Sequence, residues 1–227
     1  MLRKIFLSII FLSLITSCAR NALKERYEPT RWEKDIRAFE NRDRQNPSPK
    51  DAVLFVGSSS IVMWRTDKFF GEFDTINRGF GGSFISEVNY YTKRIVLPYK
   101  PKVIVFYAGD NDIFVGKSAQ QVFDDYKEFV KLVQQNLPET KIIFMSIKPS
   151  SSRWFSWNKM QEANKLIEDF SAKDSRLIYF DTSPALLGSD GKPNDALFQK
   201  DQLHLNRKGY EAWTKQITPV IKKAMNK

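Results

Sequence analysis

The chain has very few of the side chains, cysteine and histidine, that form disulfides and bind transition metals. Its 227 residues include one cysteine, Cys18, and one histidine, His204. A single thiol cannot form a disulfide within the chain, so the folded part has to be held together by packing alone. One imidazole and one thiol are also too few soft ligands for a zinc or iron centre. We therefore expect no metal and no cofactor.

Long apolar runs are scarce as well, and the longest lies near the N-terminus. After two basic residues, an apolar stretch of about eleven residues (5–15) is too short to span a bilayer as a stable helix. Cys18 follows in "ITSC", which resembles the lipobox of bacterial lipoproteins. An ordinary signal peptide with an incidental cysteine is the alternative. We expect residues 1–17 to be a lipoprotein signal peptide, Cys18 to be lipidated, and residues 18–29 to form a short membrane tether.

The lipobox predicts a bacterial cell-envelope protein that is lipid-anchored and faces the periplasm. Ala19 stands after the cysteine, where aspartate often marks inner-membrane retention, and this favours the outer membrane if the source is Gram-negative. The formal net charge is +10, but the basic residues are scattered and no basic run is interleaved with aromatic residues. We therefore expect membrane contact through the anchor and no nucleic-acid partner. The oligomeric state stays open.

The remaining chain, residues 30–227, predicts a single α/β domain. Apolar runs such as "KVIVFY" show no polar alternation, which is typical of parallel strands covered by helices on both faces. Amphipathic segments alternate with these runs, so we expect one doubly wound domain with a parallel sheet of about five strands. The expected strands are 52–56, 74–77, 103–108, 142–146 and 177–180, and the expected helices are 29–45, 118–136, 158–171 and 207–223.

Polar segments follow three of the expected strands, at the edge of the sheet where ligands bind in open parallel folds. "GSSS" (57–60) follows the first strand, "NRGFGGS" (77–83) includes the end of the second, and "GDND" (109–112) follows the third. "DQLHLN" (201–206) leads into the last expected helix. Each segment alone fits an ordinary turn or loop. Together they form the candidate site.

His204 carries most of the chemical information in these segments. If a near-neutral base activates a serine here, it has to be His204, since the chain has no other histidine. Asp201 stands three residues earlier, close enough for its carboxylate to hydrogen-bond the ring. A structural histidine near a helix start is the alternative. The residues alone do not decide between Ser58, Ser59 and Ser60 as the nucleophile.

In this order and spacing, the four segments resemble those of the SGNH/GDSL hydrolase family of small serine esterases, lipases and acyl hydrolases. The resemblance covers residues 51–210 approximately and implies a flavodoxin-like, three-layer α/β/α fold. The family's Gly-Asp-Ser-Leu block corresponds to residues 57–60, which makes Ser59 the implied nucleophile. Ser58 and Ser60 stand where the family has Asp and Leu, so this block is a weak signature by itself.

The other segments match the family more closely. Gly82 and Asn111 correspond to the residues that form the family's oxyanion hole together with the backbone N–H of the nucleophile, Ser59. "DQLH" matches the family's Asp-x-x-His block, so Asp201 and His204 would complete a catalytic triad. Backbone N–H groups and a neutral amide suit an oxyanion because they donate hydrogen bonds without a proton to lose.

The expected function is therefore hydrolysis of carboxylic esters, with short acyl esters, O-acetyl groups on glycans and lysophospholipids as candidate substrates. A non-catalytic envelope lipoprotein that binds glycan or lipid on the same fold is the alternative. Trp154, Phe155 and Trp157 follow the fourth expected strand, and they could line the substrate site, touch the membrane, or pack under their own loop. Met63 and Trp64 are expected in the core.

Overall fold

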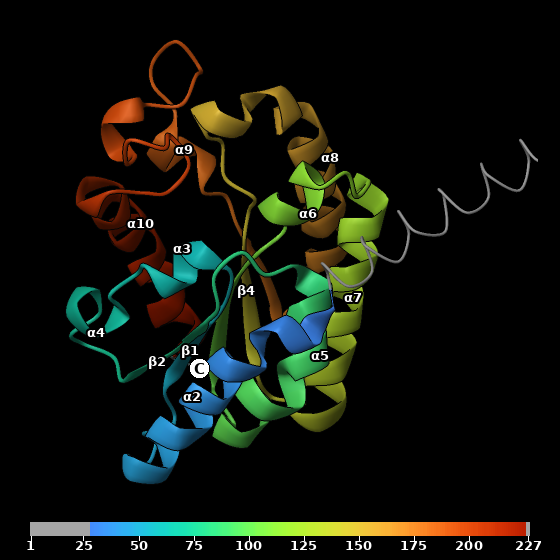
Figure 1. Ribbon diagram of the computed structural model, residues 1–227, viewed down its shortest axis with the longest axis vertical. Coiled ribbons are helices and arrows are strands. Elements are labelled where there is room, and N and C mark those ends of the chain that lie inside the picture. The colour runs from blue at the N-terminus through green and yellow to red at the C-terminus, as the bar shows by residue number, and fades with distance from the viewer. Residues whose placement is uncertain (1–27, 226–227) are drawn as a thin grey trace, which may run out of the picture.

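The computed structural model describes residues 28–225. The expected signal peptide, the lipidation site at Cys18 and most of the tether lie outside this range, so the membrane anchor stays a prediction. All five expected strands are present in one parallel sheet with the order β2-β1-β3-β4-β5, and their bounds differ from the predicted ones by at most two residues (Figure 1). The strands are β1 (Val53–Gly57), β2 (Thr75–Gly79), β3 (Val103–Tyr107), β4 (Lys141–Met145) and β5 (Leu177–Phe180).

Helices cover both faces of this sheet (Figure 1). One face carries α2 (Glu33–Gln45), α5 (Ile85–Ile95), α7 (Ala119–Asn136) and α8 (Trp157–Ser171). The other face carries α10 (Arg207–Met225) and the short α3 (Ser59–Val62) and α4 (Thr66–Phe69). The expected α/β/α layering is thereby confirmed. The remaining short elements are η1 (Pro29–Trp32), η2 (Leu97–Tyr99), α6 (Asp110–Phe114), η3 (Ser151–Ser156), α9 (Ser183–Leu186) and η4 (Asp195–Leu197).

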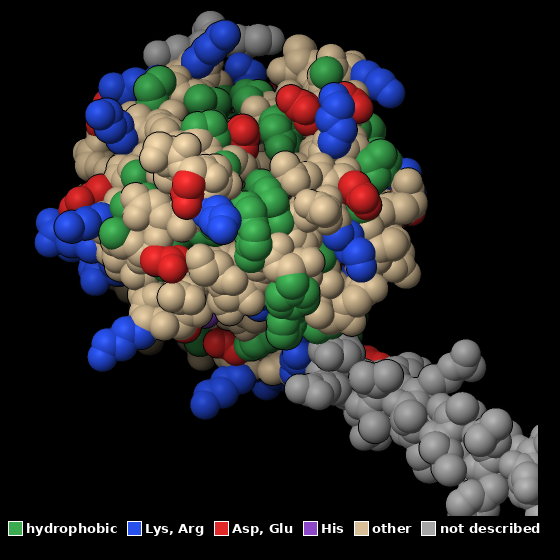
Figure 2. Space-filling view, turned by 90° about the horizontal axis from the view of Figure 1, so that it is seen from above, with side chains coloured by type: hydrophobic (Ala, Val, Ile, Leu, Met, Phe, Trp, Pro, Cys, Tyr) green, Lys and Arg blue, Asp and Glu red, His purple; other side chains and the backbone are tan. Residues whose placement is uncertain are grey.

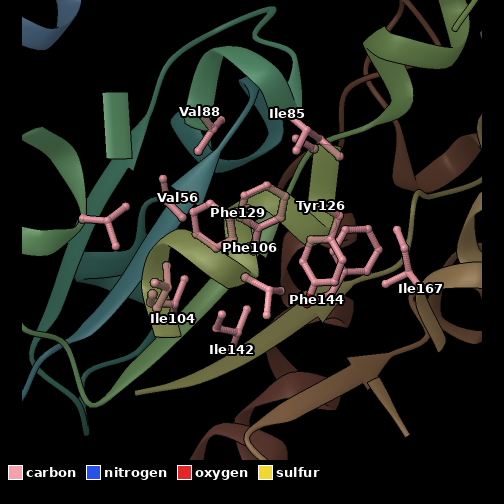
Figure 3. Close-up of a cluster of buried hydrophobic side chains, with 14 of the residues drawn as sticks. Val56, Ile85, Val88, Ile104, Phe106, Tyr126, Phe129, Ile142, Phe144 and Ile167 are labelled. Carbon is pink, nitrogen blue, oxygen red and sulfur yellow. The ribbon is translucent and has the colours of Figure 1, made fainter. Parts of the chain in front are cut away.

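The central strands are buried along their whole length, because helices shield both of their faces. Alternate residues of β1 and β3 enter two separate apolar clusters, as the period of two in a strand requires. Figure 3 shows the larger cluster, where Val56 and Phe106 from the sheet meet Tyr126 and Phe129 from α7 and Ile167 from α8. This rigid sheet fixes the positions of the loops at its carboxyl edge.

The prediction for the segment after the serines is half right. Trp64 is 1% exposed and packs against Phe55 and Trp213, as expected of a core residue. Met63 is 41% exposed, so its expected core position is wrong. The prediction assumed that helical spacing continues through this segment, whereas α3 ends at Val62 and Met63 is its exposed C-cap residue.

The surface carries charges of both signs. Figure 2 shows Lys and Arg side chains spread over one face of the molecule, with Asp and Glu side chains between them. Several of these charged side chains form ion pairs. Arg94, for example, contacts both Glu33 and Glu40. Within residues 28–225, no helix is both long enough and apolar enough to cross a membrane.

Candidate active site

The three serines lie where β1 turns into α3, and Gly57 makes this turn possible. Its φ of +139° suits glycine, and a Cβ at this position would lie 1.9 Å from the backbone oxygen of Tyr107 in β3. The missing side chain lets the two strand ends approach, and the backbone N–H of Ser58 donates to that same oxygen at 2.9 Å. Ser59 then becomes the first residue of α3.

A chain of hydrogen bonds connects Ser59 to His204 and Asp201 across 145 residues of sequence. The Oγ of Ser59 lies 3.0 Å from Nε2 of His204, and Nδ1 of the same ring lies 2.6 Å from Oδ2 of Asp201. Ser58 and Ser60 are buried and make no such contact with the histidine within the described chain. The structure thus brings together the nucleophile, base and acid expected from the sequence, and it singles out Ser59 among the three serines.

The protonation state of Asp201 determines which ring nitrogen carries the proton. Burial alone would raise the pKa of Asp201, but hydrogen bonds from the His204 ring and from the backbone N–H groups of His204 and Leu203 lower this pKa to about 2. An ionised carboxylate only accepts hydrogen bonds, so Nδ1 of His204 is the donor to Asp201. In the tautomer that carries its proton on Nδ1, Nε2 can accept the Ser59 proton.

Gly82 lies in the loop that follows β2, beside the serine turn. Its φ is +75°, and Trp32 of η1 packs 3.8 Å from the position that a Cβ would occupy. Farther along, Glu87 accepts from the backbone N–H of Phe84 and pairs with Arg31, which ties the loop to the N-terminal segment. Neither Gly82 nor Ser59 donates its backbone N–H to an acceptor in the part of the chain that the structure describes.

Asn111 in α6 brings a side-chain amide to the same place. Its Nδ2 donates to Oγ of Ser58 at 2.8 Å and to the backbone oxygen of Ser83 at 3.2 Å. The amide therefore lies between the serine turn and the Gly82 loop. The three donors expected for an oxyanion hole thus come from the start of α3, the loop after β2 and α6, at the carboxyl edge of the sheet.

A buried charged cluster, which the sequence does not predict, lies behind Asn111. The carboxylate of Asp110 lies 3.1 Å from Nζ of Lys148 and 3.3 Å from Nη1 of Arg153. Burial opposes ionisation of Asp110, but the two cations outweigh it and lower the pKa of the carboxyl group. Arg153 also donates from Nη2 to Oδ1 of Asn111 at 2.9 Å. A basic residue in a serine-rich loop resembles a surface residue, so no local signal could have revealed this burial.

The aromatic residues of this loop do not share one environment. Trp157 is 8% exposed and stacks on Trp154, and both pack against the core. The packing alternative thus describes these two side chains better than a substrate-binding wall. Phe155 is 75% exposed and lies against Phe114 of α6, so it is the most accessible of the three aromatic side chains.

The described residues contain no group of three or more histidine, cysteine, aspartate or glutamate side chains that could hold a metal ion. The site consists instead of a hydroxyl, an imidazole–carboxylate pair and several N–H donors. This set of groups can move a proton from a hydroxyl, form a bond to a carbonyl carbon and stabilise the resulting oxyanion.

Comparisons with known proteins agree with this chemistry. The model of the GDSL-like Lipase/Acylhydrolase family matches residues 62–212, a range that contains Gly82, Asn111, Asp201 and His204 and begins just after the divergent serine turn. Platelet-activating factor acetylhydrolase IB subunit alpha1 of Homo sapiens is 27% identical over 176 residues, which cover 74% of this chain and 73% of that protein.

Solved structures share the fold at lower identity. A Streptococcus pneumonia protein whose name refers to platelet activating factor superposes with a TM-score of 0.76 at 18% identity, covering 90% of this chain and 99% of that one. For a GDSL-like lipase from Bacteroides thetaiotaomicron the TM-score is 0.68 at 20% identity, with coverage of 83% and 98%. Since the family model spans well over half of the chain, this protein belongs to the GDSL-like lipase/acylhydrolase family and is a carboxylic ester hydrolase.

Proposed function

We propose that this protein hydrolyses short acyl esters, acetyl esters foremost, through an acyl-enzyme on Ser59. The observation that carries the proposal is the continuous hydrogen-bonded chain from Asp201 through His204 to the Ser59 hydroxyl. The name of the human relative, an acetylhydrolase, supports a short acyl group. The alcohol part of the ester is either a glycan or a lysophospholipid-like molecule, and the substrate panel described below distinguishes the two.

In the proposed reaction, the Oγ of Ser59 attacks the ester carbonyl carbon while its proton moves to Nε2 of His204. Asp201 keeps the ring oriented and stabilises its charged form. The carbonyl oxygen becomes an oxyanion that accepts hydrogen bonds from the backbone N–H groups of Ser59 and Gly82 and from the Asn111 amide. The C–O bond to the alcohol then breaks, and His204 returns the proton to the departing alkoxide. Water repeats the sequence on the acyl-enzyme and releases the acid.

The test uses neighbouring serines as each other's controls. Purified wild type, Ser59→Ala and Ser60→Ala are assayed with p-nitrophenyl acetate and a serine-directed fluorophosphonate, and the labelled peptide is identified by mass spectrometry. We expect Ser59→Ala to lower kcat by about 10⁴-fold or more and to abolish labelling, because the nucleophile is gone. Ser60→Ala should keep both, since Ser60 makes no contact with His204.

Two outcomes would contradict the proposal in different ways. If Ser59→Ala stays active and Ser60→Ala does not, a different serine is the nucleophile. If the wild type shows neither turnover nor labelling, a binding role for glycan or lipid replaces the acyl-enzyme. With activity established, a panel of acetylated sugars and p-nitrophenyl esters of increasing chain length separates the two substrate classes.

A further inference from the structure

We propose that Arg153 is a positioning residue that orients and polarises the oxyanion donor Asn111. The inference rests on the proposed function, in which the Asn111 amide stabilises the tetrahedral oxyanion. A primary amide has an oxygen end and a nitrogen end of nearly equal size, and a half-turn exchanges them. Only one of the two orientations places N–H groups in the oxyanion hole.

The contacts of Arg153 select that orientation. A guanidinium group has donors and no acceptor, so the atom of Asn111 that lies 2.9 Å from its Nη2 has to be Oδ1. The nitrogen end then faces Ser58 Oγ at 2.8 Å and the backbone oxygen of Ser83 at 3.2 Å. A flipped amide would direct a lone pair at the oxyanion and repel it, and Arg153 disfavours this flip together with the Ser83 backbone oxygen, which only accepts hydrogen bonds.

Arg153 is itself held in place from several sides. The residue is 8% exposed, its Nη1 lies 3.3 Å from the Asp110 carboxylate, and the Phe114 ring covers the guanidinium at 4.6 Å. Asp110, Asn111 and Phe114 all belong to α6, so one short helix carries both the oxyanion donor and the groups that fix its positioning residue. The orientation of the amide is therefore set before a substrate arrives, and one of its two N–H donors then moves from Ser58 or Ser83 to the oxyanion.

The charge of Arg153 adds to this orientation effect. A hydrogen bond from a cation to an amide oxygen draws electron density toward that oxygen and makes the amide N–H a stronger donor. The positive charge also lies one amide group away from the oxyanion in a buried region, where water screens it weakly. Both effects grow as negative charge develops on the substrate oxygen, so they lower the barrier rather than strengthen substrate binding.

A role in holding an anionic substrate is less compatible with these contacts. Asn111 accepts from Nη2, and the Phe114 ring covers the group. Nη1 is buried and lies 3.3 Å from the Asp110 carboxylate without a hydrogen bond, so a substrate anion would have to enter this buried region and compete with the Asp110 charge. The two roles predict different kinetics: positioning lowers kcat at nearly constant KM, whereas substrate capture raises KM for charged esters only.

A double-mutant cycle tests the proposal. Arg153→Met should lower kcat for p-nitrophenyl acetate by about 10- to 100-fold, as expected for loss of a charged hydrogen bond, with KM nearly unchanged. Asn111→Ala should lower kcat by about 10²- to 10³-fold. Adding Arg153→Met to Asn111→Ala should have almost no further effect, because the residue through which Arg153 acts is already gone. Arg153→Lys keeps the charge and should lie between wild type and Arg153→Met.

Two controls separate positioning from folding. Arg176→Gln removes a surface arginine whose partner is Asp174, and it should leave kcat unchanged. Thermal unfolding of every variant shows which are folded at the assay temperature. If Arg153→Met does not fold, the cycle is run with Arg153→Lys, which keeps a cation beside Asp110.

A second readout does not depend on turnover. The side-chain amide signals of Asn111 in a ¹⁵N–¹H spectrum are assigned by their absence in Asn111→Ala, and they should shift in Arg153→Met but not in Arg176→Gln. Unchanged Asn111 signals, independent losses in the cycle, or a KM effect without a kcat effect would each overturn the inference. If the wild type is inactive while the signals shift, the proposed function fails and the positioning role stands.

Discussion

The two sides of Ser59 are built differently. On the base side, the His204 side chain is 20% exposed and that of Asp201 is 46% exposed. On the oxyanion side, the side chains of Asp110 and Lys148 behind Asn111 are 8% and 1% exposed. The base, His204, thus lies on a loop in contact with water, whereas the oxyanion donor Asn111 packs against charged side chains that are buried in the protein.

This contrast follows from what each side has to do. The base exchanges protons with the substrate and with water, so access to solvent helps it. The oxyanion donors must already point at the developing charge, and buried dipoles and charges do this without having to reorganise during the reaction. We therefore expect changes on the base side to affect activity with little effect on stability, and changes in the buried cluster to affect stability as well.

The largest effect should come from the base. His204→Ala removes the only imidazole in the chain, and we expect kcat for p-nitrophenyl acetate to fall by about 10⁴-fold or more. The free energy of unfolding should hardly change, because the side chain is partly exposed. Steady-state assays and urea denaturation on the same preparation test both halves. An inactive variant that is also strongly destabilised would remove the contrast between the two sides.

An intermediate effect should come from the buried cluster. Lys148→Met leaves Asp110 with one cation instead of two, and breaking a buried ion pair in this way costs about 3 kcal/mol of stability. Asp201→Asn is the matched change on the exposed side and should cost less than about 1 kcal/mol. Urea denaturation at pH 7 compares them. Equal losses would show that burial does not distinguish the two carboxylates.

The smallest expected effect is on the free energy of unfolding at acidic pH. Because folding lowers the pKa of Asp201 to about 2, its ionised form stabilises the fold above pH ~4, and this contribution is lost as the pH falls toward 2. The side chain is nearly half exposed, so screening keeps the contribution below about 1 kcal/mol. Denaturation between pH 5 and pH 3 should show a shallower decline for Asp201→Asn than for wild type. Parallel curves would mean that Asp201 gains nothing from its partners on folding.

Much of the fold could be predicted from the sequence because the buried positions of strands and helices produce regular patterns of apolar residues. Strands such as β3 and β4 are apolar on both faces, and α7 shows its stripe and the Ser118 N-cap, whose side chain accepts from Gln121. The α5 helix was not predicted, although Ile85, Val88 and Ile95 are all buried in it. Its buried apolar residues, with Tyr91 among them, keep a helical spacing, so the helix could have been predicted from this pattern.

The site could be predicted only where residue type and order carry the information. His204 was identifiable because the chain has no alternative to it, and the choice of Ser59 needed the family block as well as the residues. Arg153 was not identifiable, since its contact with Asn111 joins residues 42 positions apart and depends on how two loops pack. Contacts of this kind arise from tertiary structure and leave no local pattern.

The α6 segment tolerates amino-acid substitutions and changes of chain length to different degrees. Its consecutive residues Asp110, Asn111 and Asp112 face Lys148, the Ser58 hydroxyl and Lys117, respectively. Successive residues of a helix point about 100° apart, so inserting or deleting one residue here would misdirect all three side chains at once. A point substitution can alter one of these three contacts and leave the other two intact. An insertion or deletion in α6 disrupts all three contacts together, so no single further substitution could restore them.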